Sequence, residues 1–178
     1  MAEWLQKIRV PIGFAFAAFY AVFSHPTPNR MWAGIGVAAL GLLLRLWATG
    51  HLRKHKELCI SGPYRHTRNP LYLGSFLVGF GFSVAAANYW ILLIFVILFF
   101  AVYAPVMRRE EKELIQAYGA SYEEYQRTVP QFLPSFHPFR SSSPRNFSWS
   151  QLILNREYNA VLGFVTVCVF LLVKLKWL

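Results

Sequence analysis

Apolar residues in this chain occur in long uninterrupted runs rather than in alternating or one-sided helical patterns. Five runs, at about 8–24, 31–50, 70–86, 89–107 and 158–178, approach or reach the length of about 20 residues that crosses a bilayer as a helix. The stretch AAANYW at 85–90 separates the third run from the fourth, and Asn88 marks the predicted turn. The pattern predicts an all-α integral membrane protein with about five transmembrane helices, formed by residues 1–178 as a single domain.

The long polar segment at 108–157 has helical signals of its own. MRREEKELIQAYG favours a helix that ends at Gly119, and the following SYEE fits a capping box with Ser121 as N-cap and Glu124 three residues later. This second helix must end before the Val129–Pro130 step. The stretch FSWSQLIL at 147–154 is expected to lie along the membrane interface.

Lysine and arginine are concentrated in alternate loops, which predicts the orientation of the chain in the membrane. The polar segments at 51–69 and 108–157 are basic, whereas the first loop holds only Arg30. The residues that set this asymmetry are Lys7, Arg9, Arg53, Lys54, Lys56, Arg65, Arg68, Arg108, Arg109, Lys112, Arg127, Arg140, Arg145 and Arg156. We therefore expect the N-terminus and both long loops to be cytoplasmic. Lys174 and Lys176 disagree with this count, and we expect them to reach the opposite headgroups.

The composition agrees with a membrane location. Charged residues make up 15% of the 178 residues, against about 25% in soluble domains. The net charge of +10 could indicate a nucleic-acid partner, but the basic residues flank apolar runs, so anionic lipid headgroups explain them better. The two cysteines lie in a polar loop and in an apolar run, and no metal-binding spacing is present.

The junction between the second loop and the third apolar run is a candidate binding site. Asn69 followed by Pro70 predicts a capped helix start. In one interpretation this is only a helix start, with Arg65 and Arg68 anchoring to lipid phosphates. In the other, the helix N-terminus and the Arg68 guanidinium bind a carboxylate or phosphate, and Gly62 and Gly74 let it approach the backbone closely.

The pair Glu110–Glu111 follows the fourth run and is also open to two interpretations. The pair is either a solvated helix surface balanced by Arg108, Arg109 and Lys112, or a carboxylate site for a ligand ammonium. Cationic groups after one span and carboxylates after the next would together suit a zwitterion such as an amino acid moiety.

Two features inside the second run have simpler interpretations. GIGVAALG at 34–41 imitates a nucleotide-binding fingerprint, but no strand precedes it, so we expect its small residues to permit close helix packing. Arg45 lies near the cytoplasmic end of the run, where it either extends to the headgroups or contributes to a binding site.

Two blocks of the sequence resemble a known family. GPYRHTRNPLYLG at 62–74 is similar to the G-P-Y-x-x-x-R-H-P-x-Y-x-G signature of the isoprenylcysteine carboxyl methyltransferase and phospholipid methyltransferase families. REEKELIQAYGASYEEYQRTVPQFLP at 109–134 resembles their second signature, with paired glutamates, an aromatic-glycine step and spaced tyrosines. The blocks occur in the family's order, separated by a helical hairpin.

The resemblance implies a membrane methyltransferase that uses S-adenosylmethionine, bound by about 58–74 and 105–134 at the cytoplasmic face, with a lipophilic acceptor arriving from the bilayer. The positions that it implicates in cofactor binding are Tyr64, His66, Arg68, Asn69, Tyr72, Gly74, Glu110 and Glu111, with Pro70, Tyr118, Gly119, Tyr122 and Tyr125 completing the motifs. Asn69 replaces the family's histidine, so a capping or hydrogen-bonding role transfers to it and a proton-transfer role does not. His66 is a candidate to compensate.

The expected reaction is methyl transfer to a prenylcysteine-like carboxylate or a lipid headgroup. Positioning and desolvation suffice for a carboxylate acceptor, with Arg68 and Glu110 as candidate catalytic residues. An amine acceptor would need a base such as His66, Glu110 or Glu111. Two alternatives are an NADPH-dependent reductase of the sterol type and a non-catalytic lipid-binding protein. The expected partners are a lipophilic small molecule and membrane lipids, without nucleic acid.

Overall fold

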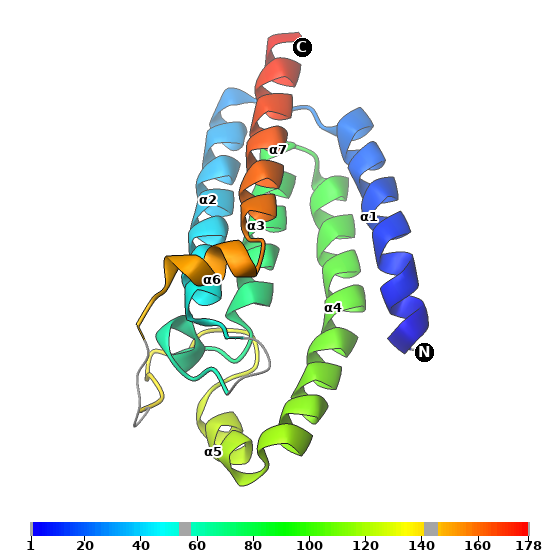
Figure 1. Ribbon diagram of the computed structural model, residues 1–178. Coiled ribbons are helices and arrows are strands. Elements are labelled where there is room, and N and C mark those ends of the chain that lie inside the picture. The colour runs from blue at the N-terminus through cyan, green and yellow to red at the C-terminus, as the bar shows by residue number, and fades with distance from the viewer. Residues whose placement is uncertain (1, 54–57, 141–145, 178) are drawn as a thin grey trace.

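The computed structural model describes residues 2–53, 58–140 and 146–177, and in the first helix it describes the side chains of 11 and 13–23. The described chain is helical and contains no strand, which confirms the all-α prediction (Figure 1). Its elements are α1 (Ala2–Phe23), α2 (Pro28–His51), the 3-10 helix η1 (Gly62–Arg65), α3 (Pro70–Ala85), α4 (Tyr89–Tyr118), α5 (Ala120–Thr128), α6 (Trp149–Leu154) and α7 (Tyr158–Trp177).

Five of these helices coincide with the five apolar runs and form an up-and-down bundle (Figure 1). Three of them, α2, α4 and α7, are long and apolar enough to cross a membrane. The apolar part of α1 (Gly13–Phe23) and α3 are shorter. The 16 residues of α3 extend about 24 Å along the helix axis.

The contact between α2 and α3 is the closest in the bundle because glycines line both sides. A Cβ atom on Gly34 would collide with the backbone of Gly81 and Ala85, and one on Gly81 would collide with the backbone of Ala38. Gly41 meets Val78 and the Gly74 carbonyl in the same way. The expectation that the small residues of 34–41 serve helix packing is therefore confirmed.

The outer helices are joined to this pair by polar as well as apolar contacts. The Tyr20 hydroxyl of α1 donates to the Phe82 carbonyl of α3 at 2.8 Å, and Met31, Ile91 and Leu171 are fully buried around it. Lys174 Nζ donates to the Ala21 and Val22 carbonyls at the end of α1. This ammonium therefore lies at the C-terminal end of α1, where a cation is favourable.

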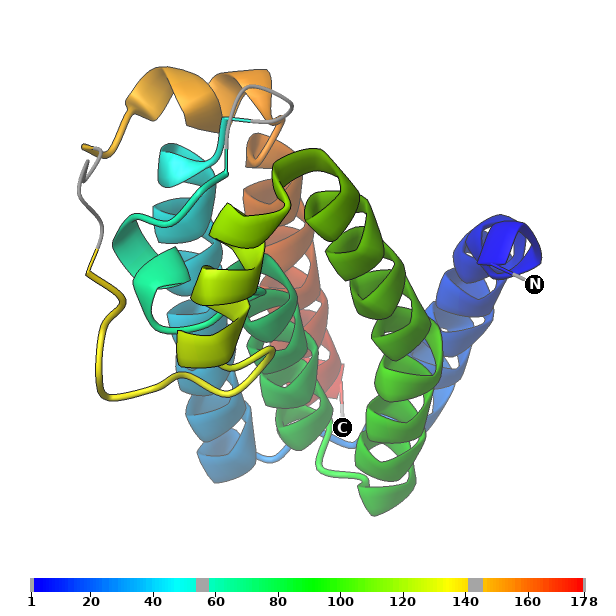
Figure 2. The ribbon, with the colours of Figure 1, turned by 90° about the horizontal axis from the view of Figure 1, so that it is seen from below.

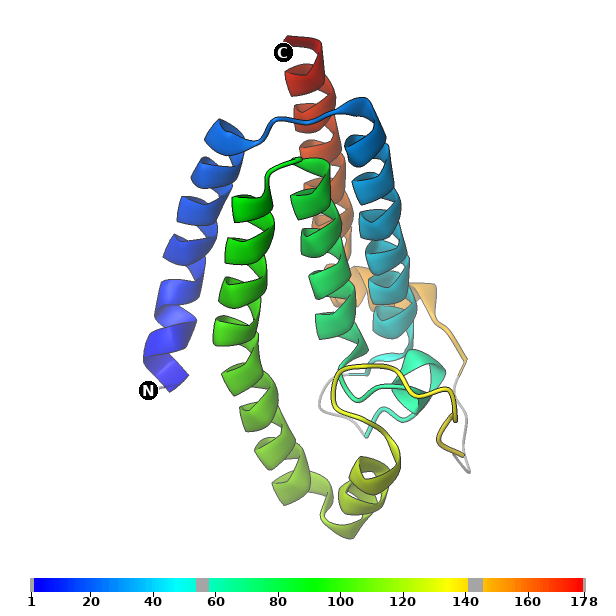
Figure 3. The same cartoon turned by 180° about the vertical axis from the view of Figure 1, so that it is seen from behind.

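Helix α4 continues far beyond the predicted span and changes direction along its length (Figures 1 and 3). The predicted membrane segment at 89–107 and the predicted helix at 107–119 form one continuous helix, with no break between them. Pro105 lies inside it, and a proline removes one helical hydrogen bond and bends the axis. The bend carries Glu110 and Glu111 toward the first turn of α3.

Gly119 ends α4 as predicted, with φ of 50°. The next helix, α5, starts at Ala120 with Gly119 as its N-cap residue, so the prediction that Ser121 caps it is wrong. A glycine with positive φ can end one helix and begin the next without the polar residue that the capping box would require.

The end of the bundle that carries η1, α5 and α6 is called the η1 end. Viewed from this end, η1 and α5 cover the ends of α2 and α3, whereas α1 lies at the margin beside α4 (Figure 2). Tyr122, Tyr125 and Val129 are buried there and form a second small core with Leu58 and Phe139. The short α6 crosses the bundle axis, with Trp149 and Ile153 exposed (Figure 1).

Several residues used for the predicted orientation lie outside the described part of the structure. They are the side chains of Lys7 and Arg9, and the residues Lys54, Lys56 and Arg145.

Candidate functional site

At the start of α3 the backbone agrees with the prediction from sequence, but the side chain of the N-cap residue does not. Asn69 is the N-cap residue and Pro70 occupies the first helical position. The Asn69 side chain makes no capping hydrogen bond, and its Nδ2 instead donates to the Gln131 carbonyl at 3.0 Å. The prediction that Asn69 caps the helix with its side chain is therefore wrong, because the amide is used to bind a distant segment.

Five consecutive residues, 65–69, bind the segment at 130–139. The backbone bonds are Arg68 N to the Pro130 carbonyl, Ser135 N to the His66 carbonyl and Phe139 N to the Arg65 carbonyl, at 2.8–3.0 Å. The side-chain bonds are Arg65 Nε to Phe139 O, His66 Nδ1 to Ser135 O, Thr67 Oγ1 to Phe132 O and Asn69 Nδ2 to Gln131 O. The end of the second signature block is thus held against the first.

The imidazole of His66 is fixed by this arrangement. Its Nδ1 lies 2.8 Å from the Ser135 carbonyl oxygen, which can only accept, so Nδ1 carries the proton. In the neutral ring Nε2 is then an acceptor. The side chains of His66 and Asn69 therefore both bind carbonyl groups of the 130–139 segment.

Arg68 and Glu111 form an ion pair at the junction of α3 and α4. Their side chains are 10% and 15% exposed. Arg68 Nε, Arg68 Nη1 and Glu111 Oε1 are buried and have no aligned hydrogen-bond partner among the described residues. Arg68 Nη1 and Glu111 Oε1 are nevertheless the two atoms in contact, so the charges pair with each other and Arg68 Nε is left as a buried donor without a partner among the described residues.

The surroundings of this pair favour neutral groups. Burial raises the pKa of the Glu111 carboxyl above its usual value, and the Arg68 guanidinium offsets part of that rise. Tyr122 of α5 hydrogen-bonds Arg68, and burial raises the pKa of its phenol as well. The site is therefore a partly desolvated one in which charge is costly unless it is paired.

Glu110 lies beside this pair and is bound from α3. The Tyr72 hydroxyl donates to Glu110 Oε1 at 2.6 Å. The Tyr72 ring in turn packs on Tyr103 of α4, with the ring centroids 5.4 Å apart. Both predicted glutamates thus face the start of α3, but they differ in burial: Glu110 is exposed and hydrogen-bonded to Tyr72, whereas Glu111 is half-buried beside Arg68.

The remaining predicted positions have packing roles in the described structure. The Tyr64 carbonyl accepts a 2.6 Å hydrogen bond from the buried Tyr125 hydroxyl, which joins η1 to α5. A Cβ on Gly74 would meet Arg45 and the Gly41 carbonyl of α2, and one on Gly62 would meet the His51 ring. The close approaches that these glycines allow are thus filled by the protein itself.

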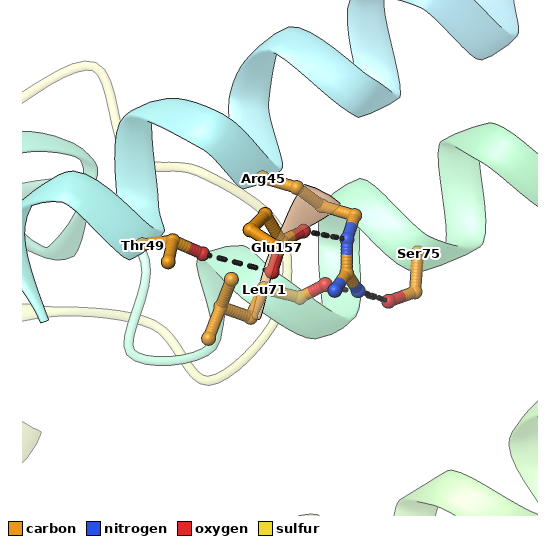
Figure 4. A network of polar contacts seen from close by, with 5 residues as sticks. All are labelled: Arg45, Thr49, Leu71, Ser75 and Glu157. Atoms are coloured by element: carbon orange, nitrogen blue, oxygen red, sulfur yellow. Dashed lines mark hydrogen bonds and ion pairs between the residues drawn. The ribbon is translucent and has the colours of Figure 1, made fainter. Parts of the chain in front are cut away.

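A second polar network, which the sequence analysis missed, joins α2, α3 and the start of α7 (Figure 4). Arg45 Nε donates to Glu157 Oε1 at 2.7 Å, and Arg45 Nη1 donates to Ser75 Oγ. Thr49 Oγ1 donates to Glu157 Oε2 at 3.2 Å. Arg45 is therefore neutralised within the bundle rather than extended to the headgroups. The signal in the sequence was a carboxylate that opens the last apolar run, because an ionisable residue inside a span requires a partner.

The structure thus brings Arg68, Tyr72, Glu110 and Glu111 together, and places Gly74 and Arg45 on the other side of α3. Within the described residues no group of three or more His, Cys, Asp or Glu side chains could hold a metal ion.

Comparisons of the sequence with known proteins show the family of the chain. The sequence profile described as phospholipid methyltransferase matches residues 29–121, which contain the first signature and the paired glutamates. A cobalt-zinc-cadmium resistance protein from Cupriavidus metallidurans is 28% identical over 76% of this chain and 65% of its own length. A nickel-cobalt-cadmium resistance protein from Alcaligenes xylosoxydans xylosoxydans is 34% identical over 62% of this chain and 51% of its own length.

A protein-S-isoprenylcysteine O-methyltransferase from Schizosaccharomyces pombe is 30% identical over 46% of this chain and 34% of its own length. The chain therefore spans less than two thirds of the length of these relatives. No solved structure matches the chain.

Proposed function

Because the chain belongs to the phospholipid methyltransferase family, we propose that it transfers a methyl group from S-adenosylmethionine to a lipophilic acceptor at the η1 end of the bundle. The observation that carries this proposal is the buried Arg68–Glu111 pair, in which Arg68 Nε has no partner among the described residues. A zwitterionic amino acid group offers a carboxylate to Arg68 and an ammonium to Glu111. Such a ligand would add charged hydrogen bonds to both side chains.

The residues present fit S-adenosylmethionine in charge and in burial. Arg68 would hold the carboxylate of its methionine part, and Glu111, with Glu110 beside it, would hold the ammonium. The family's motif adds Tyr64, His66, Asn69, Tyr72 and Gly74, of which Gly74 would act by letting α3 pack closely against α2. In this chain His66 and Asn69 would act by holding the 130–139 segment against the site.

When bound, S-adenosylmethionine supplies a methyl group on a sulfonium and leaves as a neutral thioether, so the chain need not protonate a leaving group. A carboxylate acceptor needs only to be positioned and desolvated. A protonated acceptor, such as an amine, would have to lose a proton, and the raised pKa of Glu111 suits it to receive one. Glu110 and His66 Nε2 are the other candidate bases in this region.

We propose five membrane spans, formed by α1, α2, α3, the 89–107 part of α4, and α7, with the η1 end on the cytoplasmic side. Lys and Arg side chains concentrate at the η1 end, whereas Arg30 is the basic residue of the first loop. The acceptor is then a lipid-soluble molecule, either a carboxylate of the prenylcysteine kind or a lipid headgroup. The isoprenylcysteine methyltransferase among the relatives favours the carboxylate.

Calorimetric titration with S-adenosylhomocysteine tests the proposal, because this product keeps the carboxylate and the ammonium. The parent is expected to bind it. Arg68→Ala should bind it at least tenfold less tightly, as expected for loss of about 1.5–3 kcal/mol from a charged hydrogen bond. Arg68→Lys should fall in between, because it keeps the charge and loses the planar fork. Arg109→Ala is the matched control, since Arg109 is exposed and pairs with Glu113.

Incubation with a labelled methyl donor and total membrane lipids then identifies the acceptor. Unchanged affinity in Arg68→Ala would remove this residue from the site. Binding of NADPH in place of S-adenosylhomocysteine would support a reductase instead, and donor binding without any labelled lipid would support a non-catalytic lipid-binding role.

A further inference from the structure

Helix α6 is attached at both of its ends to the end of α2. Before the helix, the Phe147 ring lies so close to Gly50 that a Cβ atom there would collide with it, and Ser148 N donates to the Gly50 carbonyl at 2.9 Å. After the helix, Asn155 Nδ2 donates to the Leu52 carbonyl at 3.2 Å. The helix therefore has a fixed position across the bundle axis at the η1 end (Figure 1).

This position places α6 at the surface of the bilayer that α7 is proposed to cross. The helix ends at Leu154 and α7 begins at Tyr158, so a single turn of chain separates the two. Trp149, Ile153 and Leu154 are 75%, 72% and 71% exposed. A helix that carries tryptophan and aliphatic side chains outward at this level is typical of elements that lie in the headgroup region.

The turn between α6 and α7 has an arginine at a position that favours glycine. Arg156 N donates to the Ile153 carbonyl and Glu157 N donates to the Leu152 carbonyl, and Arg156 has φ of 56°. These two bonds form a Schellman motif, in which the residue with positive φ is most often glycine because a Cβ atom is strained there. The turn directs Glu157 toward Arg45 of α2. The backbone thus explains the positive φ but not the choice of arginine.

A second arginine, Arg53, lies beside Arg156 at the surface. The hydrogen bond that fixes the end of α6 joins the two residues that precede these arginines, so their backbones are neighbours. Both side chains are exposed, and neither forms an ion pair with a described residue. The carboxylate next to Arg156 in the sequence, Glu157, has both oxygens bound within the bundle. Two adjacent positive charges without a counter-charge favour an anion from outside the chain.

We propose that α6 and the two arginines form a binding surface for anionic phospholipid, with the exposed side chains of α6 among the acyl chains and Arg53 and Arg156 on the headgroup phosphates. A guanidinium binds phosphate through two parallel hydrogen bonds. The occupant is the bilayer because α6 adjoins a proposed span, and its exposed apolar side chains are followed by Leu162 of α7, which is also exposed. This lipid is bound and not methylated, so the inference is independent of the proposed methyl transfer.

A fluorophore at Ile153→Cys tests whether α6 lies in the bilayer. The variant is made in a Cys59→Ser, Cys168→Ala background, labelled with NBD and reconstituted into phosphatidylcholine vesicles that contain a lipid with a nitroxide on its acyl chain. The nitroxide quenches a fluorophore that lies among the lipids, so position 153 should be quenched strongly. The same label at Glu123→Cys, on the exposed surface of α5, is the control and should be quenched much less.

The headgroup preference is measured with the nitroxide lipid in two forms, phosphatidylglycerol and phosphatidylcholine, in otherwise identical vesicles. The labelled parent should bind the phosphatidylglycerol form more tightly. Arg156→Gly should reduce the ratio of the two affinities about fivefold, as expected when one arginine leaves an anionic surface, and Arg53→Gln should have a similar effect. Arg127→Gln is the matched control, because Arg127 is an exposed arginine on α5.

The choice of glycine separates lipid binding from a structural role of Arg156. Glycine adopts positive φ without strain, so Arg156→Gly should keep or raise the melting temperature while it loses the lipid preference. Arg156→Lys keeps the charge and should keep most of the preference. If Arg156 only balances the C-terminal end of α6, Arg156→Gly should instead lower the melting temperature and leave the affinity ratio unchanged.

That last result would overturn the inference. Equal affinity of the parent for the two lipids, or equal quenching at positions 153 and 123, would overturn it as well. None of these measurements uses S-adenosylhomocysteine, so a failure here leaves the proposed function intact, and a parent that binds no S-adenosylhomocysteine leaves the lipid surface intact.

Discussion

Arg68 and Glu111 form a largely buried ion pair, and Arg68 Nε has no partner among the described residues. Removing one member of such a pair exposes the cost of the other, whereas a ligand that carries both charges can satisfy the two together. Of the two glutamates, Glu110 is the candidate catalytic residue from the sequence, and its carboxylate accepts a hydrogen bond from Tyr72. Glu111 is the one that contacts Arg68, so we expect Glu111 to be the more sensitive position for binding an amino acid group.

Glu111→Gln is expected to weaken S-adenosylhomocysteine binding about tenfold or more at neutral pH. The pKa of Glu111 is raised above 4.5 by burial, so in the parent the carboxylate that binds the ammonium forms only as pH rises through that higher value. Affinity in the parent should therefore increase with pH above 4.5, and Glu111→Gln should lose this increase. Calorimetric titrations across mildly acidic to neutral pH measure both effects.

The raised pKa of Glu111 has the opposite effect on the stability of the ligand-free protein. The folded chain holds the proton of Glu111 where the unfolded chain has released it, so the free energy of unfolding falls as pH rises through this range. Glu113→Gln is the matched control for both measurements, because Glu113 is exposed. An identical pH profile of affinity in Glu111→Gln and in the parent would show that Glu111 does not bind the ligand.

Among the elements, the α2–α3 pair is the rigid part on which the site is mounted. Its glycines bring the two helix backbones into contact at Gly34, Gly41 and Gly81. The first turns of α3, which carry Tyr72, are thereby fixed relative to α2. The α3–α4 contact is instead made through aromatic side chains, which allows the two helices to be spaced more widely at the candidate site.

Gly34→Ala is expected to destabilise the bundle by about 1–3 kcal/mol, because the added methyl group must displace the backbone of α3. Gly36→Ala in the same helix meets no atom within 4 Å. It should be neutral or stabilising by up to about 1 kcal/mol, from the higher helix propensity of alanine. Thermal unfolding of both variants in detergent checks the difference, and equal shifts would contradict the role of Gly34 in close packing.

The helices of this protein were predictable from sequence because apolar runs determine them directly. The predicted turn at Asn88 is also present, where its side chain accepts from Trp90 N. The failures at Asn69 and Ser121 have a common cause, since both were assigned from local capping patterns. Asn69 binds Gln131, 62 residues away, and Gly119 takes over the cap before Ser121. Contacts between distant segments are not encoded in the local pattern.

The candidate site was predicted in part for the same reason. The motifs identified Arg68, Tyr72, Glu110 and Glu111, which the structure brings together. Glu157 was missed, because its importance comes from partners on other elements, Arg45 and Thr49 of α2.

At the scale of the whole molecule, the bundle has two unlike ends. The predicted orientation places the η1 end in the cytoplasm. Thr27 at the opposite end and Glu123 on α5 are both exposed, so each is suitable for cysteine labelling in a Cys59→Ser, Cys168→Ala background. Thr27→Cys is expected to react with an impermeant reagent added outside intact cells, and Glu123→Cys only after permeabilisation. Labelling of Glu123→Cys from outside would reverse the orientation.

The link between Arg45 and Glu157 has a consequence for how the chain is made. The two residues are 112 positions apart, so Arg45 enters the membrane region long before its carboxylate has been synthesised. During that interval the guanidinium must be stabilised by headgroups or water, and α2 can remain shallow or tilted. The arrival of Glu157 at the start of the last helix withdraws the charge from the lipid surface. The residue before the last span thus supplies the charge partner of α2. Assembly of the bundle therefore depends on translation reaching its last helix.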